Sequence, residues 1–429
     1  MHSRGISLVN RWEGGEGTRY IDEAIVLERE ALELCTPSHP GRDFSLNSPA
    51  IDLSNRYKQH RAIENLEEAI VPDREALDLC PPGHADQPTS LNNLANDLST
   101  QYKSKSLGEM DNLDEAIVLT REALDLRPQG NPHRSTSLSD LAAHLSTRYT
   151  QLGVIEDIEA AIVLEREALS LRPQGHPDRS ISLTTLSNRL SSRYKQLGAM
   201  QDLDEGIVLA RESLALRPQG HLDRSISLNA LSIRLSSQYQ QLGEIEDAEE
   251  VILLAREALD LCPQGHPDRP TSLNSLAAHL SDRYNRIDAT QDLDEAVVLA
   301  REALVLRPQG HPYRSISLTT LSNCLSSQYK RLGTMQDLNE AIVLATEALV
   351  LCPQGHPDRS TTLITLSKCL SSRYKQLGAI EDVEEAIVLE REALDLRPQG
   401  HPDRPTSLNS LAAHLSDRYD RLRELQDLD

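Results

Sequence analysis

The sequence predicts an all-α fold, an α-solenoid built from a stack of helical hairpins. Three observations lead to this fold class: an internal repeat of 45 residues, two amphipathic helical patterns in each repeat, and a scarcity of aromatic side chains. Aromatic residues make up only 3% of the 429 residues. A globular core of this size normally uses more of them. Stacked short repeats can instead bury a core of Leu, Ala and Ile.

A glycine that follows each predicted second helix makes the repeat visible. Successive copies lie 45 residues apart, except for one interval of 47, and they are Gly83, Gly130, Gly175, Gly220, Gly265, Gly310, Gly355 and Gly400. A Leu recurs in one phase from Leu8 to Leu415, and an aromatic residue follows four positions later, from Trp12 to Tyr419. Self-similarity at a fixed period is typical of repeat architectures. Most of the tyrosines therefore belong to the repeat and not to a catalytic site.

The first helix of a repeat is clearest in residues 178–222. Apolar residues spaced three or four positions apart form one face of a helix there: Leu183, Leu186, Leu190, Tyr194 and Leu197. Asp178 or Ser180 is a suitable N-cap. We expect this helix to end near Gly198.

The second helix follows after a short polar stretch, and Asp202 is its predicted N-cap. Its apolar stripe is Leu203, Ile207, Ala210, Leu214 and Leu216. Pro218 and Gly220 end the helix, because Pro cannot continue a helix and Gly tolerates a left-handed turn. A position that is small in most copies, occupied here by Gly206, lets the two helices approach closely. Two such helices cannot bury both stripes alone, but stacked copies can.

This pattern resembles the tetratricopeptide repeat. The residues that match the family pattern in this copy are Leu190, Ser191, Tyr194, Gly198, Gly206 and Pro218. The Leu-Asn-Asn-Leu-Ala element at Leu91–Ala95 and the Gly-His-Pro-Asp-Arg turns look like the longer repeats of kinesin light chains and of arrays in basidiomycete fungi. The period here is 45 residues instead of the family's usual 34. The resemblance implies a right-handed superhelix whose first helices line a concave groove.

The repeat phase also predicts how the chain is organised. We expect residues 1–429 to form one solenoid, with a truncated first repeat over 1–44 and eight repeats of about 45 residues over 45–404. A truncated last repeat, consisting of a first helix only, is expected over 405–429.

Composition and charge narrow the class of partner. The chain carries 66 acidic and 44 basic side chains, and its net charge of −22 disfavours general nucleic-acid binding. It has no run of 18 apolar residues, so no membrane span is expected. The six cysteines are scattered, which is typical of a reducing compartment. We therefore expect a cytoplasmic protein whose partners are neither nucleic acids nor membranes.

No catalytic or cofactor-binding motif stands out, and neither an enzyme nor a cofactor or metal site is predicted. The turn histidines recur one per repeat, about a helix diameter (~10 Å) apart, which is too far for shared metal ligation. They are His39, His84, His176, His221, His266, His311, His356 and His401, and we predict a role in packing the turns. Cys35, Cys80, Cys262 and Cys352 share a phase that Arg fills in other copies. This interchange predicts a partly exposed, tolerant position.

Two adjacent positions vary strongly among repeats that are otherwise nearly identical. The inner one directly precedes the recurrent Leu and is Asp97, His144, Arg189, Arg234 and His279 in successive copies. The outer one lies one residue earlier and includes Asn96, Asn188 and Lys368. Both are expected to face away from the Leu stripe. Their variation fits either drift at an exposed surface or contact with a partner, and these eight residues are our candidates for a partner-binding groove.

We therefore predict a protein–protein interaction scaffold that binds a peptide or helix in the concave groove, without catalysis. The fungal arrays that it resembles often precede a caspase-like peptidase (CHAT) domain. This likeness implies the alternative, a recognition arm of a larger effector whose catalytic part lies outside this chain. Nearly identical repeats also allow end-to-end self-association.

Overall fold

The computed structural model describes residues 16–34, 42–60, 63–104, 110–242, 245–399 and 401–426. These residues form 18 α-helices and no strand, which confirms the predicted all-α class. The first helices of the repeats are α3 (Arg42–His60), α5 (Gln87–Ser104), α7 (Arg134–Leu152), α9 (Arg179–Leu197), α11 (Arg224–Leu242), α13 (Arg269–Ile287), α15 (Arg314–Leu332), α17 (Arg359–Leu377) and α19 (Arg404–Gln426).

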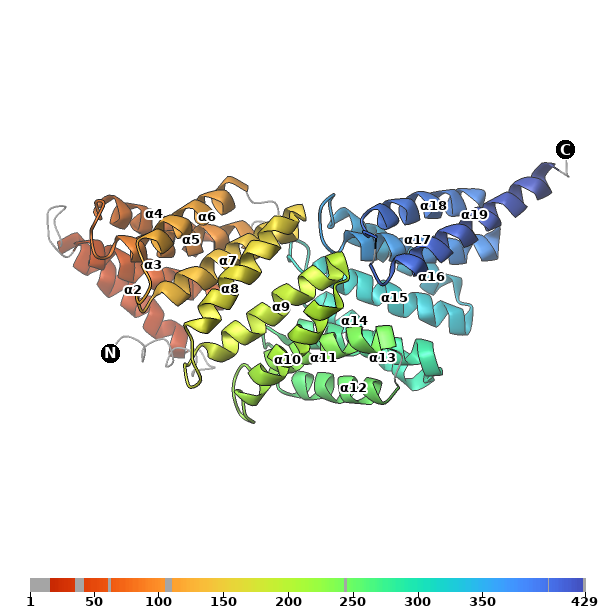
Figure 1. Ribbon diagram of the computed structural model, residues 1–429, viewed down its shortest axis with the longest axis horizontal. Coiled ribbons are helices and arrows are strands. Elements are labelled where there is room, and N and C mark those ends of the chain that lie inside the picture. Colours follow the sequence, from red (N-terminus) through yellow and green to blue (C-terminus); the bar gives the residue numbers. More distant parts are fainter. Residues whose placement is uncertain are drawn as a thin grey trace. The chain divides into compact units, whose positions relative to one another are not determined.

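The second helices alternate with them along the chain (Figure 1). They are α2 (Glu16–Leu34), α4 (Glu64–Asp78), α6 (Met110–Asp125), α8 (Ile155–Ser170), α10 (Met200–Ala215), α12 (Ile245–Asp260), α14 (Thr290–Val305), α16 (Met335–Val350) and α18 (Ile380–Asp395). The chain divides into two compact units, Met1–His144 and Leu145–Asp429, and the boundary falls inside α7. We refer to them as unit 1 and unit 2.

Within each unit, neighbouring helices pack against one another in a pattern that recurs from copy to copy. In unit 2, α13 packs against α14, α14 packs against α15, and the first helices α13 and α15 also contact each other directly. The first helices α9, α11, α13, α15 and α17 of unit 2 therefore form a continuous row. Among the helices that the structure describes, none is long and apolar enough to cross a bilayer.

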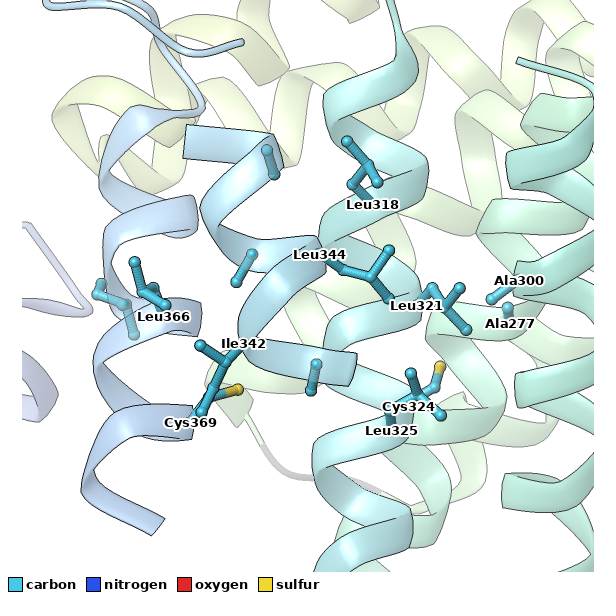
Figure 2. Close-up of a cluster of buried hydrophobic side chains, with 14 of the residues drawn as sticks. Ala277, Ala300, Leu318, Leu321, Cys324, Leu325, Ile342, Leu344, Leu366 and Cys369 are labelled. Carbon is cyan, nitrogen blue, oxygen red and sulfur yellow. The ribbon is translucent and has the colours of Figure 1, made fainter. Parts of the chain in front are cut away.

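The core of unit 2 is made of small and aliphatic side chains (Figure 2). Leu318, Leu321 and Leu325 of α15 are buried against Ile342 of α16 and Leu366 of α17. Each such side chain contributes about 1.5–3 kcal/mol when it is fully buried. A repeated set of leucines thus provides the stabilisation that larger aromatic residues provide in other cores.

Close approach of the two helices in a repeat depends on the small position, as predicted. Gly206, Ala341 and Ala386 are buried, and in these three copies a serine of the first helix donates a hydrogen bond to the carbonyl oxygen of the small residue. The Ser187 hydroxyl lies 2.7 Å from the carbonyl oxygen of Gly206, and the Ser322 hydroxyl lies 2.8 Å from that of Ala341. A larger side chain would push these helices apart.

The residues at the ends of the two helices follow the prediction only in part. Gly198 ends α9 in the left-handed conformation, as expected. Asp178 precedes α9, but its side chain makes no capping hydrogen bond. Asp202 was expected to be the N-cap of the second helix, and this was wrong: it lies in the first turn of α10, after Ala199 at the N-cap. Its carboxylate instead accepts two hydrogen bonds from Arg193, at 2.6 and 2.8 Å. A paired charge-assisted contact of this kind is stronger than a neutral cap.

Candidate binding groove

The row of first helices in unit 2 is hollowed. A cavity of about 500 Å³ opens on the face formed by α13, α15 and α17. All of its lining residues belong to these three first helices: Ala278, Ser281, Asp282, Asn285, Thr320, Asn323, Cys324, Ser326, Ser327, Lys330 and Lys368. A second hollow of about 380 Å³ shares Asn285 and Lys330 with it and extends over the end of α13 to Asp288. Both hollows are therefore lined mainly by first helices.

Two lysines give this groove its positive character. Lys330 and Lys368 line the larger hollow, and neither forms an ion pair within 4 Å of a carboxylate among the described residues, although Glu390 and Asp282 attract Lys368 from farther away. Lys368 is exposed, but the walls of the hollow partly desolvate its ammonium group, and its pKa is lowered first by this desolvation and then by repulsion from Lys330. An anion bound between the two ammonium groups would relieve this repulsion. The hollow is thus suited to a carboxylate or another anionic group.

One carboxylate offsets the lysines on the α13 side. Burial raises the pKa of Asp282, and a hydrogen bond from the Gln240 side chain at 2.6 Å opposes that shift. Asn285, Asn323 and Ser327 supply neutral donors and acceptors to the same hollow. This combination can orient a polar main chain and select an acidic side chain near α15 and α17.

The outer candidate residues are exposed or half-buried. Lys368 lines the hollow, and Ala278 and Asn323 line it from the same position of their repeats. Asn188 is exposed on α9, and its side-chain oxygen accepts a hydrogen bond from Arg234 at 2.6 Å. Asn96 of unit 1 is half-buried and donates to Asp140 at 3.3 Å.

The inner candidate residues are not exposed, contrary to our expectation. The structure buries all five between repeats: Asp97, His144, Arg189, Arg234 and His279. A first helix is in contact with the preceding repeat on one side, so the residue next to the recurrent Leu is covered by that repeat. Each position faces the preceding repeat, as in the contact of Arg189 with Ser146 at 3.1 Å. Variation in this phase therefore reflects packing between repeats.

Sequence reasoning missed the other half of the groove. Asp282, Asn285, Ser327 and Lys330 lie four and seven residues after the outer position of their own helices. Helical spacing of this kind places residues on one face. The sequence signal that could have identified these residues is their variation among repeats. One of the positions, for example, is occupied by Lys195, Gln240, Asn285 and Lys330 in successive copies.

The cysteine positions are also buried rather than partly exposed. Cys80, Cys262 and Cys352 lie in the core, as do the arginines that replace them, for example Arg217. Cys and Arg therefore do not replace each other because the position is exposed. Each contacts a hydroxyl group ten residues later: Cys262 faces Ser272 at 3.6 Å, and Arg217 donates to Ser227 at 2.8 Å. Cys35 lies outside the described residues.

The turn histidines organise the backbone of their own turn. The Nδ1 atom of His266 accepts a hydrogen bond from the backbone N–H of Asp268 at 3.1 Å. The same bond recurs at His84, His176, His221, His311, His356 and His401. His39 lies outside the described residues. Within the described ranges, no three potential metal-ligating side chains converge.

The sequence profile of the family described as tetratricopeptide repeat matches residues 271–313, which cover α13, α14 and the turn that follows. This segment is one copy of a motif that recurs through the chain. Residues 271–313 therefore match one tetratricopeptide repeat. None of the curated proteins matches it.

Solved structures with a similar fold show how such arrays are arranged. A monomeric mutant of IFIT1 bound to Gppp-AAAA superposes with a TM-score of 0.53 at 13% identity, over 96% of this chain and 77% of that one. The human IFIT1 dimer with m7Gppp-AAAA gives 0.52 at 13% identity, over 96% and 78%. A Podosopora anserina putative kinesin light chain with nearly identical TPR-like repeats gives 0.36 at 19% identity, over 51% and 98%. At these identities the likeness to IFIT1 concerns the fold alone.

Proposed function

We propose that this tetratricopeptide-repeat array binds a protein partner along the row of first helices, with the hollow over α13, α15 and α17 as its central contact. The observation that carries the proposal is the pair of lysines, Lys330 and Lys368, which lie in one hollow without ion-pair partners. The partner segment is an extended peptide or helix with an acidic residue at that point. The array contributes binding and no chemistry of its own.

The shape and chemistry of the hollow support a peptide over a small molecule. Its lining is polar and comes from three successive repeats, so a ligand that runs across the helices can contact all of them. Asparagine side chains at 285 and 323 can hydrogen-bond the main chain of such a segment, because an amide group offers both a donor and an acceptor. Asp282 would exclude a second acidic residue from the α13 side.

The test is selection of peptides on the full chain. A random peptide library is panned on the purified protein, and the enriched peptides are measured by calorimetry against wild type, Lys330→Glu and Lys368→Glu. Arg391→Glu is the matched control, since it makes the same charge change at an exposed residue of the second helix α18. We expect acidic peptides whose affinity falls about tenfold in both lysine variants and stays unchanged in the control, a change of ~1.4 kcal/mol.

The proposal is contradicted if no acidic sequence is enriched, or if all three variants bind equally well. The structures of IFIT1 contain RNA, so capped and uncapped oligoadenylate are titrated in the same assay. Binding of RNA that depends on the two lysines would replace the peptide by a nucleic acid. We expect no such binding, because the net charge of −22 repels a polyanion.

A further inference from the structure

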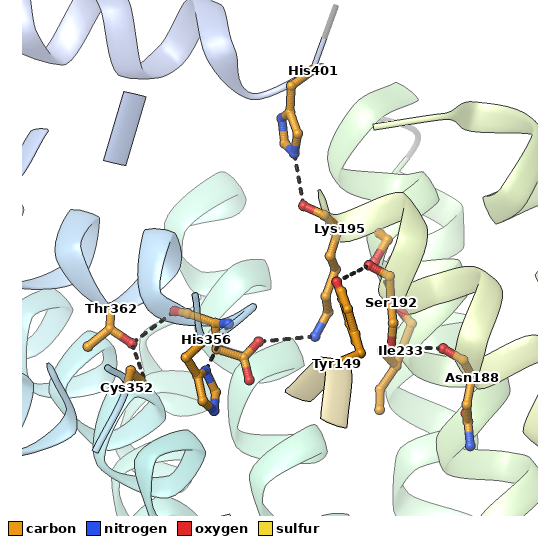
Figure 3. Close-up of polar contacts among 11 residues, drawn as sticks. Tyr149, Asn188, Ser192, Lys195, Ile233, Cys352, His356, Thr362 and His401 are labelled. Carbon is orange, nitrogen blue, oxygen red and sulfur yellow. Dashed lines mark hydrogen bonds and ion pairs between the residues drawn. The ribbon is translucent and has the colours of Figure 1, made fainter. Parts of the chain in front are cut away.

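Segments of unit 2 that lie far apart in the sequence meet at the ends of its helices (Figure 3). The side chain of His401, in the turn before α19, is 3.0 Å from the backbone oxygen of Lys195 near the end of α9, 206 residues earlier. The Lys195 ammonium group lies 3.7 Å from the carboxylate of Asp358, in the turn before α17. Gln241 of α11 donates to Asp403 at 3.3 Å. Two turns thus contact the ends of two first helices.

The orientation of His401 fixes which atom donates in this contact. Its Nδ1 atom accepts a hydrogen bond from the backbone N–H of Asp403 at 3.1 Å. The other ring nitrogen, Nε2, therefore carries the hydrogen and donates it to the carbonyl oxygen of Lys195. His401 is buried by this contact, whereas His221 in the equivalent turn before α11 is exposed. The turn motif is common to the array, but only some copies are covered.

Glycines allow the backbones to approach at the same place. A methyl group on Gly198, at the end of α9, would overlap Pro402. A methyl group on Gly153, at the end of α7, would overlap the backbone of Gly355. The equivalent Gly333, at the end of α15, has the same backbone conformation and open space around it. Among the glycines that the structure describes at the ends of first helices, Gly153 after α7 and Gly198 after α9 are the ones with this close approach.

We propose that these contacts form a latch that closes unit 2 into a tight coil and that can open. We use latch for the contact of Gly153, Lys195 and Gly198 with Gly355, Asp358, His401 and Pro402. Each polar contact is weak by itself, because an exposed ion pair and a single hydrogen bond contribute little net stability. A closure made of a few such contacts is readily reversed. Since α13 and α15 lie between its two sides in the sequence, the latch sets how strongly the groove-lining helices curve.

Zero-length crosslinking tests the latch without any partner. A carbodiimide joins an ammonium and a carboxylate group only where they touch, so it reports directly on Lys195 and Asp358. The crosslinked peptides are quantified by mass spectrometry from the monomeric fraction of the full chain. We compare wild type with Gly198→Ala, and Gly333→Ala is the control that carries the same backbone strain at an open position.

We expect the crosslink in wild type and in Gly333→Ala, and at least a tenfold lower yield in Gly198→Ala. If Gly198→Ala fails to fold by circular dichroism, Gly153→Ala replaces it, because it blocks the same closure from α7. Three results would overturn the latch: no crosslink in wild-type monomer, an equal yield in Gly198→Ala, or an equal loss in Gly333→Ala. None of these outcomes depends on whether the groove binds a peptide.

Discussion

The guanidinium group of Arg189 lies 2.8 Å from the carboxylate of Glu165, and both side chains are almost completely buried between α8 and α9. The two positions are 24 residues apart. The same offset joins Asp73 with Asp97 and Ala255 with His279. Successive repeats thus meet at one pair of positions whose residue types change along the array: an ion pair at Glu165 and Arg189, a small residue beside a histidine at Ala255 and His279, and two carboxylates at Asp73 and Asp97.

Removal of Glu165 tests this matching. Glu165→Ala leaves the buried charge of Arg189 without its partner, and loss of one member of a buried ion pair costs about 3–5 kcal/mol. Glu165→Ala combined with Arg189→His reproduces the Ala255–His279 pair and is expected to recover most of that loss. Urea denaturation followed by circular dichroism measures both. A neutral effect of Glu165→Ala would show that the pair does not stabilise the interface.

Two carboxylates meet at the corresponding position of unit 1, which makes its stability depend on pH. Burial, and then the negative charge of Asp97, raise the pKa of Asp73 to about 8 from 3.8. Burial, and then Asp52, raise the pKa of Glu28 to about 7 from 4.5. The folded state therefore holds more protons than the unfolded state between about pH 4 and 8. The free energy of unfolding falls as the pH rises through this window.

Asp73→Asn separates this effect from titration elsewhere in the chain. It removes one of the two charges, so we expect it to stabilise unit 1 at pH 8 and to have little effect at pH 4.5. Urea denaturation of wild type and variant at both pH values provides the measurement. A variant that is equally or less stable than wild type at pH 8 would contradict the raised pKa.

The fold was predictable from the sequence because it depends on periodic features that each repeat displays again. The Leu stripe, the small position at Gly206 and the glycine at the end of α9 all have the predicted roles. The inner groove candidates failed because variation alone does not distinguish an exposed position from a matched pair of buried ones. Arg189 could only be understood together with Glu165, which lies on another helix.

The core arginine and cysteine positions give a further prediction. Cys262→Arg is expected to cost no more than about 1 kcal/mol, although a charge placed in a core normally costs far more. The reason is that Ser272 and the carbonyl oxygen of Asp268 occupy the places of the groups that bind Arg217 in its repeat, Ser227 and the carbonyl oxygen of Asp223. Urea denaturation is compared with that of Ala255→Arg, a buried position without such partners. Equal destabilisation by Cys262→Arg and Ala255→Arg would contradict the prediction that this position accepts either Cys or Arg.

The central claim concerns the two adjacent variable positions of each first helix. The outer residue contacts the partner, and the inner residue packs against the preceding repeat. Lys368 and Cys369 of α17 test it most directly, since the first is exposed in the hollow and the second is buried. The measurement is the affinity for a selected acidic peptide and the free energy of unfolding of Lys368→Ala and Cys369→Ala. We predict that Lys368→Ala weakens binding about tenfold with stability within ~0.5 kcal/mol of wild type, whereas Cys369→Ala loses about 1 kcal/mol of stability and retains its affinity. An affinity loss in Cys369→Ala together with unchanged binding in Lys368→Ala would contradict the account.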